Sequence, residues 1–566
     1  MLLKRWIIQP SDDIAATRLS TELNIQLVLG KLLIQRGINS FEEAKRFFRP
    51  SIEHLHDPFL MQDMDKAVVR IEEAIEHGEK VMLYGDYDVD GTTSVALMHE
   101  FLEPRVKKLD YYIPDRYKEG YGVSFASIEY AKQHHVKLII AMDCGIKAQE
   151  QVALASSYGI DFIVCDHHTP DETLPAAIAV LDPKRTDCNY PFKELSGCGI
   201  AFKLAQAIVK KHGEPIESLY PLLDLLAVSI ACDLVLIQDE NRVLAHFGLV
   251  QFNNHGRIGL KALVSIREKE FPLNINDIVF GIGPLINAAG RLGDARLAVR
   301  LLLARDRLSA TNLAQELVAQ NELRREAEAE MGDEVSRQIN EQIDAGRKSL
   351  VLFCDRWHKG IVGIIAARVA ESAHRPTFVL TAYEGKVMGS VRTINGFDVY
   401  EALRECEGLM ESFGGHPFAA GLVMLPENLD AFREQIEMVT QKNMRPEQML
   451  PEVGVNAIID ITQITPKFYN ILKQFAPFGP GNMRPVFLAT ALQPTQHIRV
   501  SRNEMHLLFS IKQTETETMQ GAAFGQGHLY DALKTAKSLD MCFVLEESYW
   551  NGKPIIRFQA KDLRLK

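Results

Sequence analysis

The chain has 566 residues, of which 46% are hydrophobic and 24% are charged, and its formal net charge is −11. This length exceeds what one hydrophobic core can organise, so we expect about three or four domains. The longest apolar runs are strand-length and the first residues show no signal-peptide pattern, which argues against a membrane-spanning or secreted protein. The acidic charge gives no support to a polyanionic partner, yet it leaves room for a local basic groove or for bound cations.

The eight cysteines are scattered along the chain without any Cys-x-x-Cys pair. Zinc sites use closely spaced cysteines, and disulfide frameworks are typical of short secreted chains. The pattern therefore indicates reduced thiols, and we expect a cytoplasmic protein.

Residues 1–75 combine helix and loop, and from about residue 80 short apolar strands alternate with amphipathic helices. Such alternation predicts an α/β fold with a parallel, doubly wound sheet, whose ligands bind beyond the carboxyl ends of its strands. The expected strands are Val81–Tyr84, Leu109–Ile113, Val136–Met142, Phe162–Cys165 and Ala177–Leu181, with helices at 92–103, 125–134, 148–158 and 199–212.

The segment Leu308–Ile343 is polar, free of proline and rich in Ala, Glu, Arg and Gln, which predicts a long helix that joins two bodies. A second α/β unit is expected after it. Its elements are the strand Ser349–Cys354, the helix Gly360–Ser372, the strand Thr377–Thr381 and a glycine-rich stretch at 413–421.

After about residue 450 the pattern changes to β structure. Asn551-Gly552 lies between the alternating runs Met541–Tyr549 and Pro554–Ala560, which is a strong hairpin signal. Roughly five strands in this space suit a small C-terminal β-barrel such as an OB-fold. The expected domains are an N-terminal segment that packs on the first α/β domain (1–75), that domain (76–305), the connecting helix (306–345), the second α/β domain (346–448) and the OB-like barrel (449–566).

Three acids at alternate positions, Asp86, Asp88 and Asp90, follow the first predicted strand in the sequence GDYDVDGTTS. Carboxylates this close repel one another unless a cation neutralises them, and Mg²⁺ or Mn²⁺ prefers carboxylate oxygens. A turn with Asp as helix N-cap is one alternative. A calcium loop is another, although its twelfth position is Leu97 rather than Glu and a strand precedes it.

More candidate ligands follow later strands. Asp143 comes directly after the third predicted strand, and Asp166-His167-His168 follows the fourth. Alone, such an acid is often a helix cap and a His-His pair is often surface decoration. Asp233 lies in apolar sequence, where a carboxylate is costly to bury unless it is paired or bound to metal. Because parallel strand ends meet at one edge of a sheet, we expect these groups to form one metal centre.

The order DxDxDG, Asp, Asp-His-His and a later Asp resembles the four motifs of the DHH phosphoesterase superfamily. Within it, the chain is similar to the RecJ family of single-stranded-DNA-specific exonucleases, a likeness carried by GDYDVDGTTS, AMDCG, VCDHH, LDPKR, SGCGIAFKL, ACDLV and GPLINAAGRLGDA. DRWHKGIVG, GSVR and FGGH resemble the associated DHHA1 domain, and PFGPGN resembles the start of the family's OB domain. The resemblance covers residues 80–566, so it implies a DHH catalytic domain, a DHHA1 domain and a nucleic-acid-binding barrel.

The resemblance implies a centre of two divalent metal ions, Mn²⁺ or Mg²⁺, that hydrolyses a phosphodiester. Its ligands would be Asp88 and Asp90 on separate ions, Asp143 as the catalytic bridge between them, and His167 and Asp233 completing one site. His168 would face the scissile phosphate, and Asp86 and Asp166 would bind an ion or support a ligand. Many superfamily members have a histidine four residues before the first ligating Asp, where this chain has Tyr84.

An exonuclease that starts at a 5′ end needs a pocket for the terminal phosphate, which the planar fork of arginine binds well. By resemblance, the residues for this pocket or for DNA binding are Arg116, Arg291, His358, Ser390, Arg392, Gly414, Gly415 and His416. Outside such a context, a lone arginine more often makes a solvated salt bridge. In the barrel the candidates are Arg499, Arg502, Lys512, Arg557, Phe524, Tyr549 and Trp550, although aromatic residues more often pack in a core.

The implied activity is 5′-to-3′ digestion of single-stranded DNA to 5′-mononucleotides, in DNA recombination and repair. An oligoribonuclease or small-phosphoester hydrolase of the same superfamily would share the chemistry, but such enzymes are usually shorter and lack an OB-like tail. A non-catalytic nucleic-acid scaffold is the alternative of another class, and the intact set of acids and histidines argues against it. A helicase and single-strand-binding protein are partner hypotheses. The choice between Mg²⁺ and Mn²⁺, activity on RNA and the oligomeric state stay open.

Overall fold

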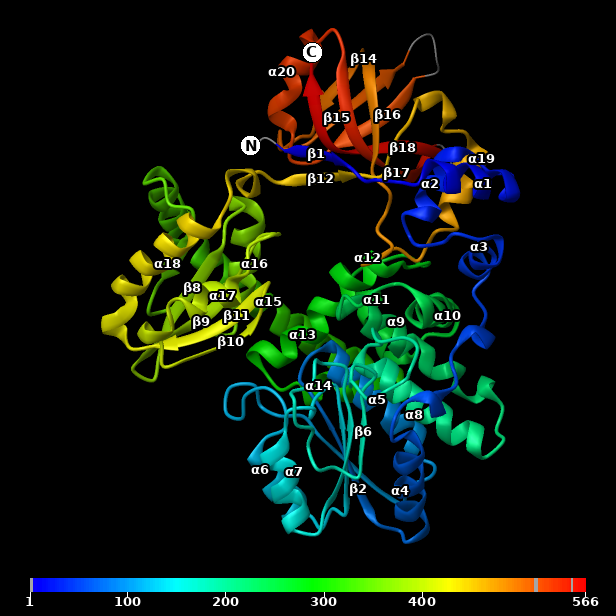
Figure 1. Ribbon diagram of the computed structural model, residues 1–566, viewed down its shortest axis with the longest axis vertical. Coiled ribbons are helices and arrows are strands. Elements are labelled where there is room, and N and C mark those ends of the chain that lie inside the picture. Colours follow the sequence, from blue (N-terminus) through cyan, green and yellow to red (C-terminus); the bar gives the residue numbers. More distant parts are fainter. Residues whose placement is uncertain (1–3, 514–517, 551–552) are drawn as a thin grey trace. The chain divides into compact units, whose positions relative to one another are not determined.

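The computed structural model describes residues 4–513, 518–550 and 553–566 (Figure 1). Its internal contacts divide the chain into two compact units. The larger unit comprises Gln9–Asn321, Asn456–Ala560 and Leu565–Lys566, and the smaller unit comprises the chain up to Ile8, Glu322–Val455 and Lys561–Arg564. Each unit contains an α/β sheet, and the larger unit also contains a barrel.

The larger unit contains a sheet of five parallel strands in the order β3-β2-β4-β5-β6 (Figure 1). These strands are β2 (Lys80–Gly85), β3 (Lys108–Tyr112), β4 (Leu138–Met142), β5 (Asp161–Cys165) and β6 (Ala179–Leu181). Every residue of β4 is buried. A continuous apolar run suits a central strand covered on both faces, because it has no polar face to expose.

Helices cover both faces of this sheet. On one face, α4 (Met64–Glu76), α5 (Val89–Leu102) and α8 (Gly197–Lys211) share a core with Val81 and Leu83 of β2. On the other face, α6 (Phe125–Gln133) and α7 (Gln149–Ser157) share a core with Met82 and Tyr84. Successive residues of a strand point to opposite faces, so one strand contributes to both cores and the sheet is doubly wound.

Further helices complete the sheet domain. Before the sheet lie α1 (Asp13–Leu23), α2 (Leu27–Ile34) and α3 (Phe41–Phe48); after it lie α9 (Leu223–Cys232), α10 (Asp239–His255), α11 (Ile258–Ile266), α12 (Ile275–Asp277), the π-helix η4 (Ile278–Ile282), α13 (Gly283–Leu292) and α14 (Arg296–Leu302). The guanidinium of Arg242 in α10 donates to the carbonyl oxygens of Phe47 and Phe475. This arginine therefore ties the N-terminal helices and the segment before the barrel to the sheet domain.

The barrel closes through its first long strand. Its elements are β13 (Ala457–Ile458), α19 (Pro466–Lys473), β14 (Phe487–Val500), β15 (Leu507–Lys512), β16 (Met519–Ala523), α20 (Tyr530–Thr535), β17 (Leu539–Trp550) and β18 (Lys553–Leu565). β14 pairs with β17 near its start and with β15 near its end. Register shifts between Ala489 and Leu492 and between Pro494 and Ile498 let this strand bend, which closes the sheet.

The smaller unit contains a mixed sheet in the order β10-β11-β9-β8-β7, with only the β7–β8 pair parallel (Figure 1). Its elements are β7 (Leu350–Phe353), α16 (Val362–Ala373), β8 (Thr377–Tyr383), β9 (Lys386–Arg392), α17 (Val399–Arg404), β10 (Ser412–His416), β11 (Ala419–Met424) and α18 (Leu429–Asn443). A separate parallel pair joins β1 (Arg5–Ile8) to β12 (Glu452–Val455).

The predicted fold class is confirmed: a doubly wound sheet, a long helix, a second α/β domain and a C-terminal barrel. The long helix α15 runs from Arg307 to Asp344. β17 and β18 are neighbours in the barrel, while the predicted turn residues Asn551 and Gly552 lie outside the described residues. The exact domain boundaries stay predictions. None of the described helices combines the length and the apolar composition that crossing a bilayer requires.

Candidate metal centre

The predicted acids lie at the carboxyl ends of three neighbouring strands. In the parallel register, Gly85 of β2 is aligned with Met142 of β4, and Met142 with Cys165 of β5. The next residues along the chain are Asp86, Asp143 and Asp166. Folding therefore brings three distant segments to one edge of the sheet. At this edge Asp143 has a φ of 60°, a left-handed conformation that turns the chain sharply.

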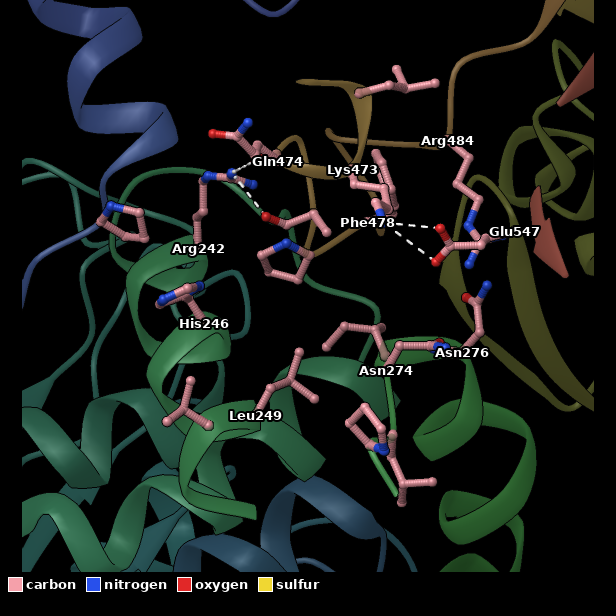
Figure 2. Close-up of a pocket in the computed structure, with 18 of the residues that line it drawn as sticks. Arg242, His246, Leu249, Asn274, Asn276, Lys473, Gln474, Phe478, Arg484 and Glu547 are labelled. Atoms are coloured by element: carbon pink, nitrogen blue, oxygen red, sulfur yellow. Dashed lines mark hydrogen bonds and ion pairs between the residues drawn. The ribbon is translucent and has the colours of Figure 1, made fainter. Parts of the chain in front are cut away.

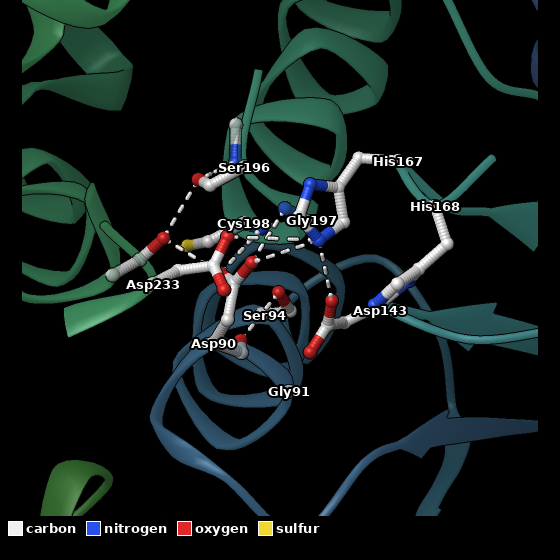
Figure 3. A network of polar contacts seen from close by, with 12 residues as sticks. Asp90, Gly91, Ser94, Asp143, His167, His168, Ser196, Gly197, Cys198 and Asp233 are labelled. Carbon is white, nitrogen blue, oxygen red and sulfur yellow. Dashed lines mark hydrogen bonds and ion pairs between the residues drawn. The ribbon is translucent and has the colours of Figure 1, made fainter. Parts of the chain in front are cut away.

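Four of the five predicted metal ligands come together, with three carboxylates around the imidazole of the fourth, His167 (Figure 3). Its Nε2 atom lies 3.1 Å from an oxygen of Asp143, 3.6 Å from Asp233 and 3.8 Å from Asp90. Two sets of ligand atoms lie within 4.8 Å of one another: Asp90 with His167 and Asp233, and Asp143 with His167 and His168. The site thus gathers oxygen and nitrogen ligands at the spacing of a metal centre.

The start of α8 and the last turns of α9 hold the carboxylate of Asp90 in place (Figure 3). The backbone N–H groups of Gly197 and Cys198 donate to its oxygens at 2.6 and 3.0 Å, and the Ser229 hydroxyl donates at 2.6 Å. Gly197 is required because a Cβ there would lie 2.7 Å from the Cβ of Asp143. Sequence reasoning missed these supporting residues. The signal that could have found two of them is a capping serine followed by glycine at the start of a predicted helix, in Ser196-Gly-Cys-Gly.

Asp88 and Asp86 make contacts that differ from those of Asp90. Asp88 is the N-cap of α5 and accepts a hydrogen bond from the Gly91 N–H at 3.0 Å, so the helix-cap alternative describes part of its role. It belongs to neither set of converging ligand atoms found in the described residues. Asp86 is 1% exposed, and one of its oxygens makes no hydrogen bond within the described part of the chain. A carboxylate buried in this way needs a nearby cation or a proton.

Asp166 holds the second histidine. Its oxygen lies 2.7 Å from Nδ1 of His168, and it accepts hydrogen bonds from the backbone N–H groups of His167 at 2.8 Å and Ile146 at 2.9 Å. Burial alone would raise the pKa of Asp166. The hydrogen bond from His168 and the bonds from the backbone N–H groups together outweigh burial, and the pKa of Asp166 falls to about 2. Asp166 is therefore an ionised group that orients His168.

The other acids are crowded into a nearly dry site. Burial, followed by the charge of Asp90, raises the pKa values of Asp143 and Asp233, and burial lowers the pKa of His167. Among the described residues, Asp143 Oδ1, His167 Nε2 and Asp233 Oδ2 are buried atoms without a hydrogen bond. Divalent cations would satisfy these atoms and relieve the repulsion between the carboxylates, so the residues fit Mn²⁺ or Mg²⁺.

Two predicted phosphate-binding arginines come from segments that contact the acidic loop. The guanidinium of Arg116 lies 4.9 Å from the centroid of the Tyr87 ring. Arg291 belongs to α13, where the preceding Gly290 packs so closely that a Cβ would lie 2.6 Å from the carbonyl oxygen of Tyr87. Tyr87 stands between Asp86 and Asp88. Both arginines therefore belong to segments that pack beside the sheet edge that carries the acids.

A second cluster of predicted phosphate-binding residues lies in the smaller unit. On β9, the guanidinium of Arg392 donates to the Ser390 hydroxyl at 2.8 Å. A Cβ at Gly363, in the first turn of α16, would lie 3.2 Å from the same hydroxyl. The missing side chain at Gly363 therefore lets a helix N-terminus approach a serine and an arginine, a combination that suits an anion.

The remaining candidates of the smaller unit lie on other elements. Gly414, Gly415 and His416 are exposed on β10, at the edge of the sheet. Gly415 has a φ of 149°, and a Cβ there would lie 2.5 Å from the Cα of Ala420, so this position requires glycine. His358 precedes α16, and its Nδ1 accepts a hydrogen bond from the Gly360 N–H at 3.1 Å.

The barrel presents some of its predicted contacts at the surface. Arg499 and Arg502 are exposed, while Lys512 and Arg557 are half-buried. Phe524 is 54% exposed and its ring packs edge-on against His506, so it is placed as a stacking surface rather than as core. The side chains of Tyr549 and Trp550 lie outside the described residues.

A cavity of about 1020 Å³ in the larger unit is lined by α10, α19 and the segment before β14 (Figure 2). Large cavities are the usual first candidates for ligand sites. Its Lys473 is paired with Glu547, and Arg242 donates to the carbonyl oxygens of Gln474 and Ala476. None of the predicted metal ligands lines it. The titratable groups that suit chemistry therefore lie at the sheet edge and not in this cavity.

Comparison with known proteins matches the same three domains. Residues 80–230 match the model of the DHH family N-terminal domain, 346–442 match the DHHA1 domain and 455–562 match the RecJ OB domain. The single-stranded-DNA-specific exonuclease RecJ of Bacillus subtilis is 33% identical over 561 residues, which are 99% of this chain and 70% of that protein. The RecJ of Dickeya dadantii is 31% identical, over 96% of this chain and 97% of that protein.

The chain belongs to the RecJ family. A crystal structure of RecJ from Thermus thermophilus in complex with Mn²⁺ has a TM-score of 0.85 and 28% identity, and the match covers 99% of this chain and 80% of that one. A second structure of the same protein is in complex with Mg²⁺, with a TM-score of 0.79. The Thermus thermophilus RecJ thus binds both of the cations that suit the donor set of this chain.

Proposed function

We propose that this RecJ-family chain is a metal-dependent exonuclease that degrades single-stranded DNA from 5′ to 3′ and releases 5′-mononucleotides, in recombination and repair. The observation that carries the proposal is the convergence of Asp90, Asp143 and Asp233 on the imidazole of His167. The relatives named above are single-stranded-DNA-specific exonucleases, which supports the substrate.

The residues of the metal centre divide the work. Asp88 and Asp90 would hold separate ions, Asp143 would bridge them, and His167 and Asp233 would complete one site. Bound there, two divalent ions supply a water of lowered pKa and neutralise the charge that develops on the phosphate. His168, oriented by Asp166 at 2.7 Å, faces the scissile phosphate and donates to one of its oxygens.

The direction of digestion depends on recognition of the terminal phosphate. The paired Ser390 and Arg392, which lie beside the N-terminus of α16, support such a pocket in the smaller unit. Within the smaller unit, Gly414, Gly415, His416 and His358 would add backbone and ring donors. In the larger unit, Arg116 and Arg291 would bind phosphates of the DNA beside the metal centre. Exposed Phe524 and the exposed Arg499 and Arg502 of the barrel would bind the single strand by stacking and charge.

A single-strand exonuclease depends on proteins that deliver its substrate. A helicase that unwinds duplex DNA and a single-strand-binding protein are therefore the partners that we propose. All eight cysteines are free thiols, which supports the reducing cytoplasm as the compartment. The predicted boundaries at 75, 305, 345 and 448 are proposed as the limits of the domains.

The decisive experiment is digestion of an end-labelled single strand with Mn²⁺ or Mg²⁺, with and without EDTA. We expect 5′-mononucleotides, progress from the 5′ end and complete loss of activity in the chelator. Activity that survives excess EDTA would contradict the metal mechanism. Faster hydrolysis of a dinucleotide than of a long strand would instead indicate an oligoribonuclease.

A further inference from the structure

Tyr84 stands where many members of the superfamily have a histidine, and it has a structural setting of its own. It is fully buried in β2, and its ring is stacked on that of Tyr112 with the centroids 5.7 Å apart and the planes 9° apart. Its hydroxyl donates to the carbonyl oxygen of Gly122 at 2.7 Å. Because a buried hydroxyl needs a partner, this bond fixes one point of the loop between β3 and α6.

The residue before Gly122 contacts the second histidine of the Asp-His-His motif. The hydroxyl of Tyr121 lies 3.0 Å from Nε2 and 3.5 Å from Nδ1 of His168, and the two rings meet edge to face with centroids 5.9 Å apart. Nδ1 of the same ring lies 2.7 Å from Asp166. Asp166 accepts from Nδ1–H, and the Tyr121 hydroxyl makes its shorter contact with Nε2. The imidazole is thus held at both nitrogens.

The tip of this loop has few other constraints on its backbone. Gly120 and Gly122 flank Tyr121 with φ angles of 87° and 80°, a region that glycine enters freely. The base of the loop is anchored separately, because Glu119 accepts hydrogen bonds from the Asp115 N–H and the Tyr112 hydroxyl. Loss of the Tyr84 hydroxyl would therefore release Tyr121 while the rest of the loop stays attached.

We infer that Tyr84 is a positioning residue for His168, which it reaches through the Gly122 carbonyl and the Tyr121 hydroxyl. The inference rests on the proposed function, in which His168 faces the scissile phosphate. A phosphate oxygen that contacts Nε2 comes within reach of the Tyr121 hydroxyl as well, so the loop presents a second donor beside the imidazole. Tyr84 therefore takes a role in this chain that does not require a metal ligand at its position.

The test is steady-state digestion of an end-labelled single strand with Mn²⁺ by the full chain and its Tyr84→Phe and Tyr121→Phe variants. Phenylalanine keeps the ring and removes only the hydroxyl. Groups that orient ligands near metal centres typically contribute about 10- to 100-fold to activity. We expect kcat to fall at least tenfold (about the lower limit of that range) in each variant, with KM and the melting temperature unchanged. The double variant should be no slower than the slower single one, since both changes act on one contact.

Tyr158→Phe is the matched control, because its hydroxyl donates to Glu129 at 2.6 Å in the same domain without contact to His168. A Tyr84→Phe variant with parental kcat would overturn the inference. So would equal losses of kcat and melting temperature in Tyr84→Phe and Tyr158→Phe, which would indicate a general effect on folding. If the parent chain itself does not digest single strands, the proposed function fails first, and the inference fails with it.

Discussion

The two α/β sheets of this protein place charge in opposite ways. The parallel sheet of the larger unit ends in buried carboxylates, with Asp90 1% exposed and Asp143 2% exposed. The mixed sheet of the smaller unit instead carries Ser390 and Arg392 on β9 and exposed glycines on β10. Parallel strands bring all their carboxyl ends to one edge and so concentrate ligands, whereas antiparallel neighbours alternate their ends. On the proposed function, the first sheet carries out hydrolysis and the second recognises the end of the strand.

The most severe test of this division is Asp143→Ala. The change removes the group that is proposed to bridge the metal ions, so hydrolysis should fall about 1,000-fold or more while binding to single-stranded DNA is largely kept. Single-turnover digestion and fluorescence anisotropy measure the two quantities. Asp171→Ala, which removes only an exposed ion pair with Lys147, is the control. Undiminished hydrolysis in Asp143→Ala would refute the bridging role.

Removal of metal should destabilise the larger unit alone. Binding at a hundredfold excess over Kd stabilises a folded unit by about 2.7 kcal/mol, and the proposed ligands all lie in Gln9–Asn321. Calorimetry with EDTA and with Mn²⁺ should therefore shift the transition of that unit and leave the transition of the smaller unit in place. A shift of both transitions, or of neither, would contradict the prediction that metal stabilises only the larger unit.

Gly197→Ala should damage the metal centre without removing a ligand. Its Cβ would lie 2.7 Å from the Cβ of Asp143 and would push Asp143 away from the helix start that binds Asp90. We expect metal affinity to fall about 10- to 100-fold, as for other groups that support metal ligands, measured as the Mn²⁺ concentration for half-maximal activity. Gly332→Ala in α15 is the control, because a Cβ there meets nothing within 4 Å. Equal metal dependence in the two variants would contradict the close packing at Gly197.

Arg392→Ala should have a smaller and more selective effect. A hydrogen bond to a charged group contributes about 1.5–3 kcal/mol, so the variant should lose about tenfold or more of its preference for 5′-phosphorylated strands over 5′-hydroxyl strands. The ratio of kcat/KM for the two strands is the measurement. An equal loss on both substrates would place the terminal-phosphate pocket elsewhere.

Much of the fold could be predicted from the sequence because its periodicity is regular. The first strand was expected at Val81–Tyr84 and runs from Lys80 to Gly85, and the long helix was placed within a residue or two of its ends. The metal site followed from one topological rule, that acids after parallel strands share an edge. This rule does not predict the residues that hydrogen-bond to the proposed ligands. Ser229 bonds Asp90 across 139 residues of chain, and no local pattern announces such a contact.

The choice between a helix cap and a metal ligand at Asp88 was also out of reach of the sequence. An aspartate after a strand and before a helix suits a cap and a ligand equally well, and only the side-chain conformation shows that one oxygen accepts from the Gly91 N–H. Tyr121 had no signal either, since its hydroxyl reaches His168 only when the loop after β3 is folded against the sheet.

The pairing of β1 with β12 has a consequence for how the chain is made. Arg5 pairs with Glu452 and Ile8 with Val455, so β1 has no partner until β12, far along the chain, has been synthesised. Throughout that interval its backbone donors and acceptors form an open edge, which is prone to wrong pairing. Long-range closure of this kind is slow. Nascent chains interrupted before residue 452 should therefore need chaperone protection at β1.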